Sequence, residues 1–136
     1  MVTKNGTPKP DKLVGTSLKD KLFGLGGNDK INGLDGNDIL EGGRGNDKLT
    51  GGDGADTFVF GEKSGKDMIT DFDVNKDVIS IAKGLNGIKS AEDVLDHAKQ
   101  KGKHVEIDLG DGNKITLKFT KLADLKDNPE DHFDVS

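Results

Sequence analysis

Apolar residues recur at every ninth position through the first half of the chain. The recurring positions are Leu13, Leu22, Ile31, Leu40, Leu49 and Phe58. An aspartate stands two residues before each of them: Asp11, Asp20, Asp29, Asp38, Asp47 and Asp56. A glycine stands five residues before each aspartate: Gly6, Gly15, Gly24, Gly33, Gly42 and Gly51. A period shared by three kinds of residue predicts a repeat architecture, in which every repeat supplies one very short strand with a single inward apolar side chain.

The repeats differ in completeness along the chain. Residues 24–59 hold four complete ones, GLGGNDKIN, GLDGNDILE, GGRGNDKLT and GGDGADTFV, each with a second glycine three residues after the first. The two earlier repeats, GTPKPDKLV and GTSLKDKLF, lack that glycine. Because the end repeats of a stacked array are usually atypical, residues 1–14 are predicted to form a degenerate N-terminal cap and residues 15–59 the regular array.

The complete repeats resemble the nonapeptide G-G-x-G-x-D-x-U-x, with U apolar, of the RTX (repeats-in-toxin) family. The resemblance implies an all-β fold, a parallel β-roll in which two nonapeptides complete one turn and calcium ions lie in the loops on each side. On that geometry Leu13, Ile31 and Leu49 stack in one sheet. Leu22, Leu40 and Phe58 then stack in the facing sheet.

Calcium chemistry suits this pattern of residues. The ion takes about 6–8 oxygen ligands from carboxylates and backbone carbonyls, and glycine permits the positive φ that a six-residue loop needs to aim carbonyls at an ion. Asparagine, which precedes three of the aspartates, also tolerates that region. Several calcium ions are expected. The candidate calcium-binding residues are Asp20, Asp29, Asp38, Asp47 and Asp56, with Asp71, and the loop residues Gly24, Gly26, Gly27, Asn28, Gly33, Asp35, Gly36, Asn37, Gly42, Arg44, Gly45, Asn46, Gly51, Asp53 and Gly54.

The nine-residue period fails after Val59, and residues 60–136 are predicted to form a capping region. The stretches DTFVF, DMIT and DVISI have the apolar alternation of short strands. The longer stretch DMITDFDVNKDVISI resembles the segment that closes the roll in serralysin-type proteases and in mannuronan epimerase modules. Asp67, Asp71 and Asp77 match the acidic positions of that segment.

Further along, apolar residues at helical spacing predict a helix from Ser90 to Gly102, with Ser90 and Asp93 placed as a capping box. The stretch VEIDLGDGNKITLKF predicts a hairpin whose return strand points Ile115, Leu117 and Phe119 inward. The all-β roll is therefore expected to carry a small C-terminal lid, made of one α-helix and this hairpin, that buries its open end.

The last residues, about 120–136, are acidic with scattered apolar positions. They resemble the L-x-x-L…D-x-F-x-V endings of RTX proteins that leave the cell by type I secretion, whose signal is C-terminal. That resemblance implies the type I secretion machinery as a partner and a secreted, extracellular location. The alternative is a frayed acidic tail.

Composition narrows the function classes. The chain has 136 residues, low apolar content, a third of its residues charged, and no cysteine. Such a composition lies near the disordered class, so calcium is expected to contribute to folding. The net charge of −5 argues against a nucleic-acid-binding protein. No apolar run is long enough to span a membrane, and a monomer is expected.

No set of catalytic residues is evident. The chain has no H-E-x-x-H or G-x-S-x-G motif, and His97, His104 and His132 have no second ligand at metal spacing, which favours structural or solvated roles. The prediction is a non-catalytic module, with an activity, if any, in the rest of a larger secreted protein.

Two functions stay open at this point. One is a calcium-binding module that folds on calcium binding and supports secretion and extracellular folding. The other is a module that binds an anionic polysaccharide such as alginate, as the epimerase resemblance implies. Two nonapeptides per turn would align Lys12, Lys30 and Lys48 in one outward row, about 4.8 Å apart. That row could follow a uronate polymer, or it could be a solvated face that keeps the sheet soluble.

Overall fold

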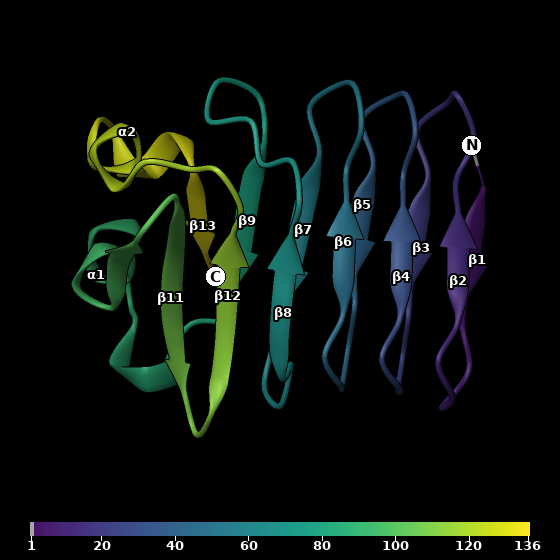
Figure 1. Cartoon of the computed structure of the whole chain (residues 1–136), viewed down its shortest axis with the longest axis horizontal. Helices are drawn as coiled ribbons and strands as arrows, with labels where there is room; N and C mark the ends of the chain where they lie inside the picture. Colours follow the sequence, from purple (N-terminus) through teal and green to yellow (C-terminus); the bar gives the residue numbers. More distant parts are fainter. Residues whose placement is uncertain (1) are drawn as a thin grey trace.

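The computed structural model describes residues 2–136, which form two facing sheets of short strands (Figure 1). The β1–β13 sheet contains, in spatial order, β1 (Thr3–Asn5), β3 (Lys21–Phe23), β5 (Ile39–Glu41), β7 (Thr57–Phe60), β9 (Val78–Ile81) and β13 (Phe133–Val135). The β2–β10 sheet contains β2 (Lys12–Val14), β4 (Lys30–Asn32), β6 (Lys48–Thr50), β8 (Lys66–Ile69), β12 (Asn113–Leu117), β11 (His104–Gly110) and β10 (Ala98–Lys101). The predicted parallel β-roll is confirmed.

Strand pairing follows from the nine-residue period. Successive strands alternate between the two sheets, so that each repeat pairs in parallel with the repeat 18 residues away. Ile31, for example, pairs with Leu13 on one side and with Leu49 on the other. In the facing sheet Leu40 lies between Leu22 and Phe58 in the same way. Two nonapeptides therefore make one turn of the roll.

The core of the roll is the stack of single apolar residues from each strand. Leu22, Leu40, Leu49 and Phe58 are fully buried, and Ile31 is 2% exposed. Leu13, in the first turn of its sheet, is only partly buried. Because each repeat contributes one such residue, the core between the sheets is one side chain wide per strand, and each turn depends on its neighbours for burial.

The C-terminal region continues this core. Strand β12 pairs in parallel with β8, and β13 pairs in parallel with β9, so both sheets are extended edge to edge. The helices α1 (Ala91–Asp96) and α2 (Leu122–Lys126), with the 3₁₀ turns η1 (Leu85–Gly87) and η2 (Pro129–Asp131), lie at this end of the roll. The predicted hairpin is confirmed as β11 and β12, but it lengthens the sheet rather than lying across its end as part of a lid.

The predicted helix from Ser90 to Gly102 is wrong in its second half. Ser90 does cap it, since its hydroxyl accepts the Asp93 N–H at 3.2 Å. The helix ends at Asp96, and Ala98–Lys101 forms β10, which pairs antiparallel with β11. Gly102, with φ 60°, lies in the turn between these strands. The run of lysine and glutamine carries no apolar period, so pairing with a neighbouring strand decided its conformation.

Phe119 also departs from the expectation. The alternation predicted it to point inward, but its side chain is 71% exposed. Strand β12 ends at Leu117, and Phe119 has a left-handed backbone with φ 54°. The inward face of the return strand therefore stops at Leu117.

Residues 120–136 are folded, which excludes the frayed tail as a description of this segment. Leu125 in α2 is fully buried, and Phe133 in β13 is 2% exposed. No helix in residues 2–136 has the length and apolar character to cross a membrane.

The apolar stack gives a direct stability prediction. Leu40→Ala removes a fully buried side chain from the middle of the roll and is expected to lower the unfolding free energy of the calcium-loaded protein by about 2–5 kcal/mol. Leu18→Ala, at a leucine that is 60% exposed, should change it by about 0.5 kcal/mol or less. Urea titrations followed by circular dichroism measure both. Equal losses in the two variants would contradict the single-residue core.

Candidate metal sites between the loops

Two columns of aspartates run along the roll, one on each side. Every repeat aspartate lies one residue before its strand, where the loop re-enters the sheet. The first column contains Asp11, Asp29, Asp47 and Asp67, and the second contains Asp20, Asp38, Asp56 and Asp77. In both columns the backbone N–H of each aspartate donates to Oδ1 of the aspartate one turn later, at 2.8–2.9 Å. One carboxylate oxygen of each residue thus links neighbouring turns.

The second carboxylate oxygen is the unusual feature of the columns. In Asp29, Asp38, Asp47 and Asp56 the Oδ2 atom is buried and has no hydrogen-bond partner among residues 2–136. A buried carboxylate oxygen without a partner costs free energy unless a cation or a proton reaches it. Four such atoms at equivalent positions indicate a repeated ligand site.

The first glycine of each repeat makes room for that site. A Cβ atom on Gly15 would lie 2.6 Å from Asp20 Oδ2 and 2.7 Å from the carbonyl oxygen of Gly33. The equivalent positions at Gly24 and Gly33 would meet the carboxylate of their own repeat and the carbonyl of the glycine one turn later. The space beside Gly15, Gly24 and Gly33 is therefore lined by a carboxylate oxygen and a carbonyl oxygen together, and beside Gly42 and Gly51 the carboxylate is the nearest group.

These donors suit calcium. Within residues 2–136 no group of three Asp, Glu or His side chains converges, so an ion between the loops would depend on backbone carbonyls in addition to the aspartates. Calcium accepts such mixed oxygen ligands in flexible geometry, whereas zinc sites are built from side-chain nitrogen and sulfur. The residues present fit calcium.

The electrostatics of the columns point the same way. Burial raises the pKa of Asp56 to about 8, against the hydrogen bond from Asp38, and the nearby carboxylates of Asp77, Asp38 and Asp71 raise it further. Burial, followed by repulsion between carboxylates, also raises the pKa of the other members of the set, namely Asp29, Asp38, Asp47, Asp67 and Asp77. The columns hold more negative charge than their hydrogen bonds stabilise.

Asp20 is an exception among the predicted aspartates. Burial alone would raise its pKa, but the backbone N–H groups of Thr16 and Val2 and the Thr16 hydroxyl outweigh burial and hold the pKa below its usual range. Its carboxylate already has partners within the chain.

The side chains of the three predicted asparagines accept hydrogen bonds from neighbouring turns. Asn28 Oδ1 accepts the N–H of Asn46, and Asn37 Oδ1 accepts the N–H of Ala55, each at 2.8 Å. Asn46 Oδ1 accepts the N–H of Lys66 in the same way. None of the three has a positive φ, and their side chains link successive loops. As calcium ligands these asparagines stay a prediction.

The left-handed positions fall elsewhere in the loops. The second glycines of the complete repeats have a left-handed backbone with φ of 82–104°: Gly27, Gly36, Gly45 and Gly54. The second residue of each of these repeats takes it as well, including Leu25 at 70° and Leu34 at 67°. The side chains of Asp35, Arg44 and Asp53 are exposed, so these residues and Gly26 stay predicted as ligands through their backbone carbonyls only.

Sequence reasoning left two members of the columns outside the ligand set. Asp67 and Asp77 continue the two columns, although the spacing grows from 18 to 20 and 21 residues. Both keep the Asp-x-apolar signature of the repeats, in Asp67-Met68-Ile69 and Asp77-Val78-Ile79, which is the signal that identifies them. Asp71, which was predicted, accepts the N–H groups of Gly51 and Gly52 at 2.9 and 2.8 Å beside the last complete loop.

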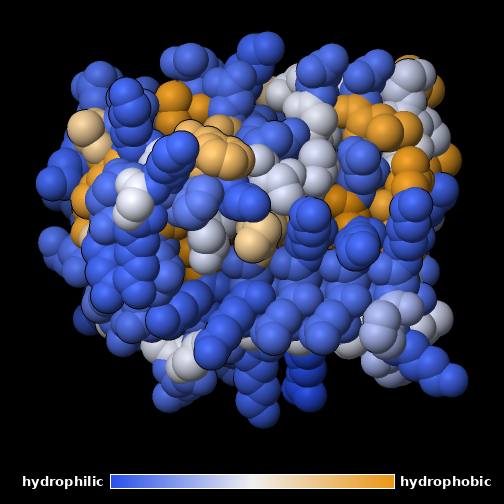
Figure 2. Space-filling model, in the orientation of Figure 1, coloured by the Kyte–Doolittle hydropathy of each residue, from blue (hydrophilic) through white to orange (hydrophobic). Residues whose placement is uncertain are grey.

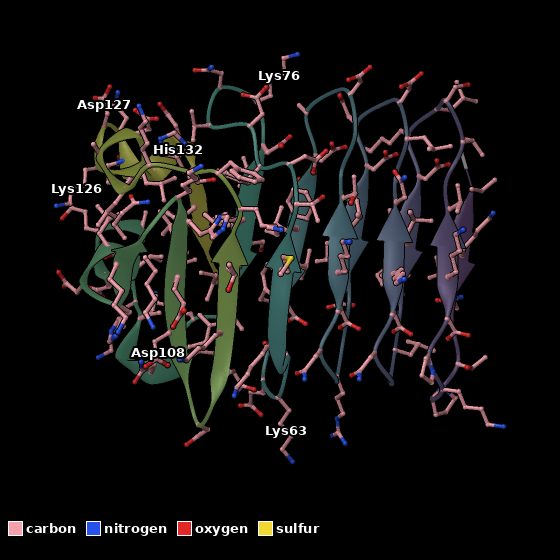
Figure 3. The ribbon with its side chains drawn as sticks, viewed as in Figure 1. Lys63, Lys76, Asp108, Lys126, Asp127 and His132 are labelled. Carbon is pink, nitrogen blue, oxygen red and sulfur yellow. The ribbon has the colours of Figure 1, made fainter. Side chains whose placement is uncertain are left out.

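The three histidines lie apart and bond to other groups. His104 Nδ1 accepts the Phe119 N–H at 3.0 Å, and His97 Nδ1 lies 3.2 Å from Asn86 Nδ2. His132 is buried, and its Nε2 lies 2.9 Å from the carbonyl oxygen of Asp127 (Figure 3). These contacts are structural.

Comparison with known proteins decides the family. The family described as "RTX calcium-binding nonapeptide repeat (4 copies)" matches residues 6–40, 14–49 and 32–62. The chain belongs to the RTX calcium-binding repeat family. Its aspartate columns are the stacked, buried ladders typical of calcium binding by RTX repeats. A search of curated proteins found no match.

Solved structures extend the RTX assignment to the whole chain. The AlgE6R3 subunit of the Azotobacter vinelandii mannuronan C5-epimerase is 30% identical with a TM-score of 0.65, over 87% of this chain and 78% of that one. The AlgE6R2 subunit of the same enzyme is 27% identical with a TM-score of 0.70, over 97% and 90%. The extracellular lipase LipA from Serratia marcescens shares the fold, with a TM-score of 0.78 and 22% identity. This RTX chain is covered to 98% in that comparison but spans only 21% of the lipase.

The raised pKa values predict opposite pH trends with and without calcium. A pKa raised from 3.8 to about 8 at Asp56 means that the folded RTX module binds more protons than the unfolded chain between pH 4 and 8. Calcium-free stability should therefore rise as pH falls through that window. With calcium bound, protons compete with the ion, so stability should fall toward pH 4. The β content of resin-depleted protein by circular dichroism, and thermal melts of calcium-loaded protein, each at pH 5 and pH 8, test this. A calcium-free protein that is less stable at pH 5 than at pH 8 would contradict the buried, repelling carboxylates.

Proposed function

We propose that this chain is a non-catalytic RTX module that folds when several calcium ions bind between its loops, and that it supports type I secretion and extracellular folding of a larger secreted protein. The observation that carries the proposal is the set of four buried Oδ2 atoms without partners. Each sits where a carbonyl or a further acidic group of the next turn is close, and calcium would satisfy all of them at once.

The energetic argument is the coupling of metal binding to folding. The glycines lose much backbone entropy on folding, and each repeat buries only one apolar side chain in return. Carboxylates stacked one turn apart repel each other as well. When the ions bind, Asp29, Asp38, Asp47 and Asp56 would supply side-chain oxygens, and the binding free energy becomes folding free energy.

The cellular setting follows from calcium availability. Extracellular calcium modules bind with Kd of roughly 10⁻⁴–10⁻³ M, so a module of this class stays unfolded at low cytosolic calcium and folds outside the cell. RTX repeats are typical of proteins exported by type I secretion. The C-terminal residues 120–136 would serve the secretion machinery, in agreement with the L-x-x-L and D-x-F-x-V pattern of this end.

Calcium-coupled folding makes a specific titration prediction. Circular dichroism should show little β structure in calcium-free protein at pH 7.5 and a cooperative gain on calcium addition. Asp38→Asn removes the charge from one unpartnered carboxylate and should shift the midpoint to several-fold higher calcium. Asp35→Asn changes an exposed aspartate in the same loop and should shift it much less. Full β structure without calcium, or equal shifts in both variants, would contradict the proposal.

A second candidate function is binding of an anionic polysaccharide. The strand register supports this candidate, because Lys30 pairs with Lys12 on one side and with Lys48 on the other. All three side chains are exposed, and the space-filling view shows hydrophilic residues with hydrophobic ones among them on this side of the molecule (Figure 2). On the facing sheet Lys21 is followed by Ile39 and then Thr57.

The row also has no acidic partner on the surface. Ion pairs in the described part of the chain occur only at Glu106, with Lys101 and Lys114. A lysine row without neutralising carboxylates can attract a polyanion, and that attraction should weaken with salt. The likeness to two epimerase subunits supports a polysaccharide as the class of polyanion.

The lysine row is tested by titrating calcium-loaded, isotope-labelled protein with alginate oligomers at low salt. Amide shifts should concentrate on β2, β4 and β6 and disappear in the Lys12→Ser/Lys30→Ser/Lys48→Ser variant. The control Lys21→Ser/Lys63→Ser/Lys76→Ser loses the same charge from other places; Lys63 and Lys76 lie on loops at opposite edges of the molecule (Figure 3). Equal loss of binding in both variants would show attraction by overall charge, and no shifts would exclude this second function.

A further inference from the structure

The first two loops of the roll satisfy their aspartates without a metal ion. In the loop of residues 15–20, the Thr16 N–H donates to Asp20 Oδ2 at 2.5 Å, and the Thr16 hydroxyl lies 3.0 Å from both Asp20 oxygens. The hydroxyl also accepts the Leu18 N–H at 3.1 Å. The carboxylate and the hydroxyl therefore both have partners inside one loop.

The loop of residues 6–11 repeats this arrangement. The Thr7 N–H donates to Asp11 Oδ2 at 2.5 Å, and its hydroxyl lies 3.1 and 3.2 Å from the two Asp11 oxygens. The same hydroxyl accepts the Lys9 N–H at 3.1 Å. Both threonines occupy the second position of their repeat, four residues before the aspartate.

The later loops differ at this same position. It is occupied by Leu25, Leu34, Gly43 and Gly52, and all four have a left-handed backbone with φ between 67° and 84°. Neither threonine has a positive φ. The aspartates of these four loops are the ones whose Oδ2 atoms are buried without a partner. The loop therefore occurs in two states. In one, the N–H of a threonine donates to the aspartate carboxylate. In the other, the residue at this position has a left-handed backbone and the carboxylate Oδ2 atom has no partner.

We propose that the second residue of each repeat decides whether its loop takes calcium, so that Thr7 and Thr16 keep the first two loops metal-free and the ions enter the four loops with leucine or glycine there. This inference rests on the proposed calcium-binding function and specifies it. An amide N–H and a hydroxyl proton directed at the carboxylate occupy the oxygen that the ion would need. They also place partial positive charge where a cation would sit.

The first glycine of the repeat does not explain the difference. Gly6 and Gly15 have the same close carboxylate and carbonyl neighbours as Gly24 and Gly33, so the space beside the first glycine exists in all of these loops. In the first two loops a threonine N–H donates to the carboxylate oxygen in this space, whereas in the later loops that oxygen has no partner. The end of the roll is then closed by bonds within the chain, whereas the middle depends on an exchangeable ion.

Leu34→Thr tests the proposal by moving the threonine into a calcium loop. Leu34 stands four residues before Asp38, as Thr16 stands before Asp20, and its side chain is 40% exposed. The expected result is about one calcium ion fewer per protein than in the wild type, measured by native mass spectrometry and by equilibrium dialysis with ⁴⁵Ca. Leu34→Ala is the control, because alanine has no hydroxyl and no branch at Cβ that would oppose the left-handed backbone; it should retain the wild-type number of ions.

Thr16→Gly makes the reverse test. Glycine removes the hydroxyl and permits the left-handed backbone, so this variant should bind about one ion more than the wild type at saturating calcium. The Asp20 amide resonance should then move during calcium titration beyond the point at which the wild-type signal is constant. If Leu34→Thr keeps the wild-type number of ions, or Thr16→Gly gains none while remaining folded, the second position does not control occupancy.

The outcomes separate this inference from the function on which it rests. If the wild type binds no calcium, the proposed function fails. If the wild type binds calcium and folds with it, but the variants with and without threonine bind equal numbers of ions, only the role of Thr7 and Thr16 is wrong.

Discussion

The unpartnered oxygen of the buried aspartates is the constraint on which the rest of the structure depends. Each carboxylate uses Oδ1 to accept a hydrogen bond from the neighbouring turn and keeps Oδ2 in a dry space beside a glycine. Folding without a cation would leave several negative groups buried one turn apart. That arrangement is unfavourable because burial and mutual repulsion both act against the charged form. A hard cation between the turns converts the same arrangement into a favourable one.

The other features of the roll are consequences of this arrangement. The loops need glycine at the first position because a side chain there would occupy the space shared by the carboxylate and the carbonyl. The strands are three or four residues long within the repeats, since each must return the chain to the next loop after presenting one apolar residue. So narrow a core cannot by itself offset the entropy of a glycine-rich chain.

The two ends of the roll are held by bonds within the chain, in different ways. At the N-terminal end, threonine hydroxyls lie within hydrogen-bond distance of the carboxylates of Asp11 and Asp20. At the C-terminal end, Asp71 bonds to the last glycine loop, and β12 and β13 cover the edges of β8 and β9 with ordinary strand pairing. Under the proposed function, the ion-dependent part would lie between two ends that are held by hydrogen bonds and apolar contacts. The lysine row crosses the outer face of this central part, so any polyanion site there would exist only in the calcium-folded state.

The sequence by itself determined the roll, its period and the aspartates that form its two columns. Asp, Gly and apolar residues locked at nine-residue spacing can be satisfied together only by stacked turns, and the pairing of Leu13, Ile31 and Leu49 followed from that spacing. The sequence also gave the hairpin turn at residues 110–113, where glycine and aspartate permit the tight reversal. These features are local or strictly periodic, so neighbouring residues are enough to specify them.

Only the tertiary structure decided the features that depend on contacts between distant segments. Lys99 and Gln100 form a strand because their backbone pairs with β11, and their sequence has no apolar period that would favour a helix. Asn28 and Asn37 became links between turns because the stack brings another N–H within reach 18 residues away. The bonds of Thr16 to Asp20 and the lack of a partner at Asp38 Oδ2 likewise could not be read from the sequence, where both loops show an aspartate at the same position. Hydrogen-bond satisfaction depends on which atoms share a buried space, and that is fixed only when the turns are stacked.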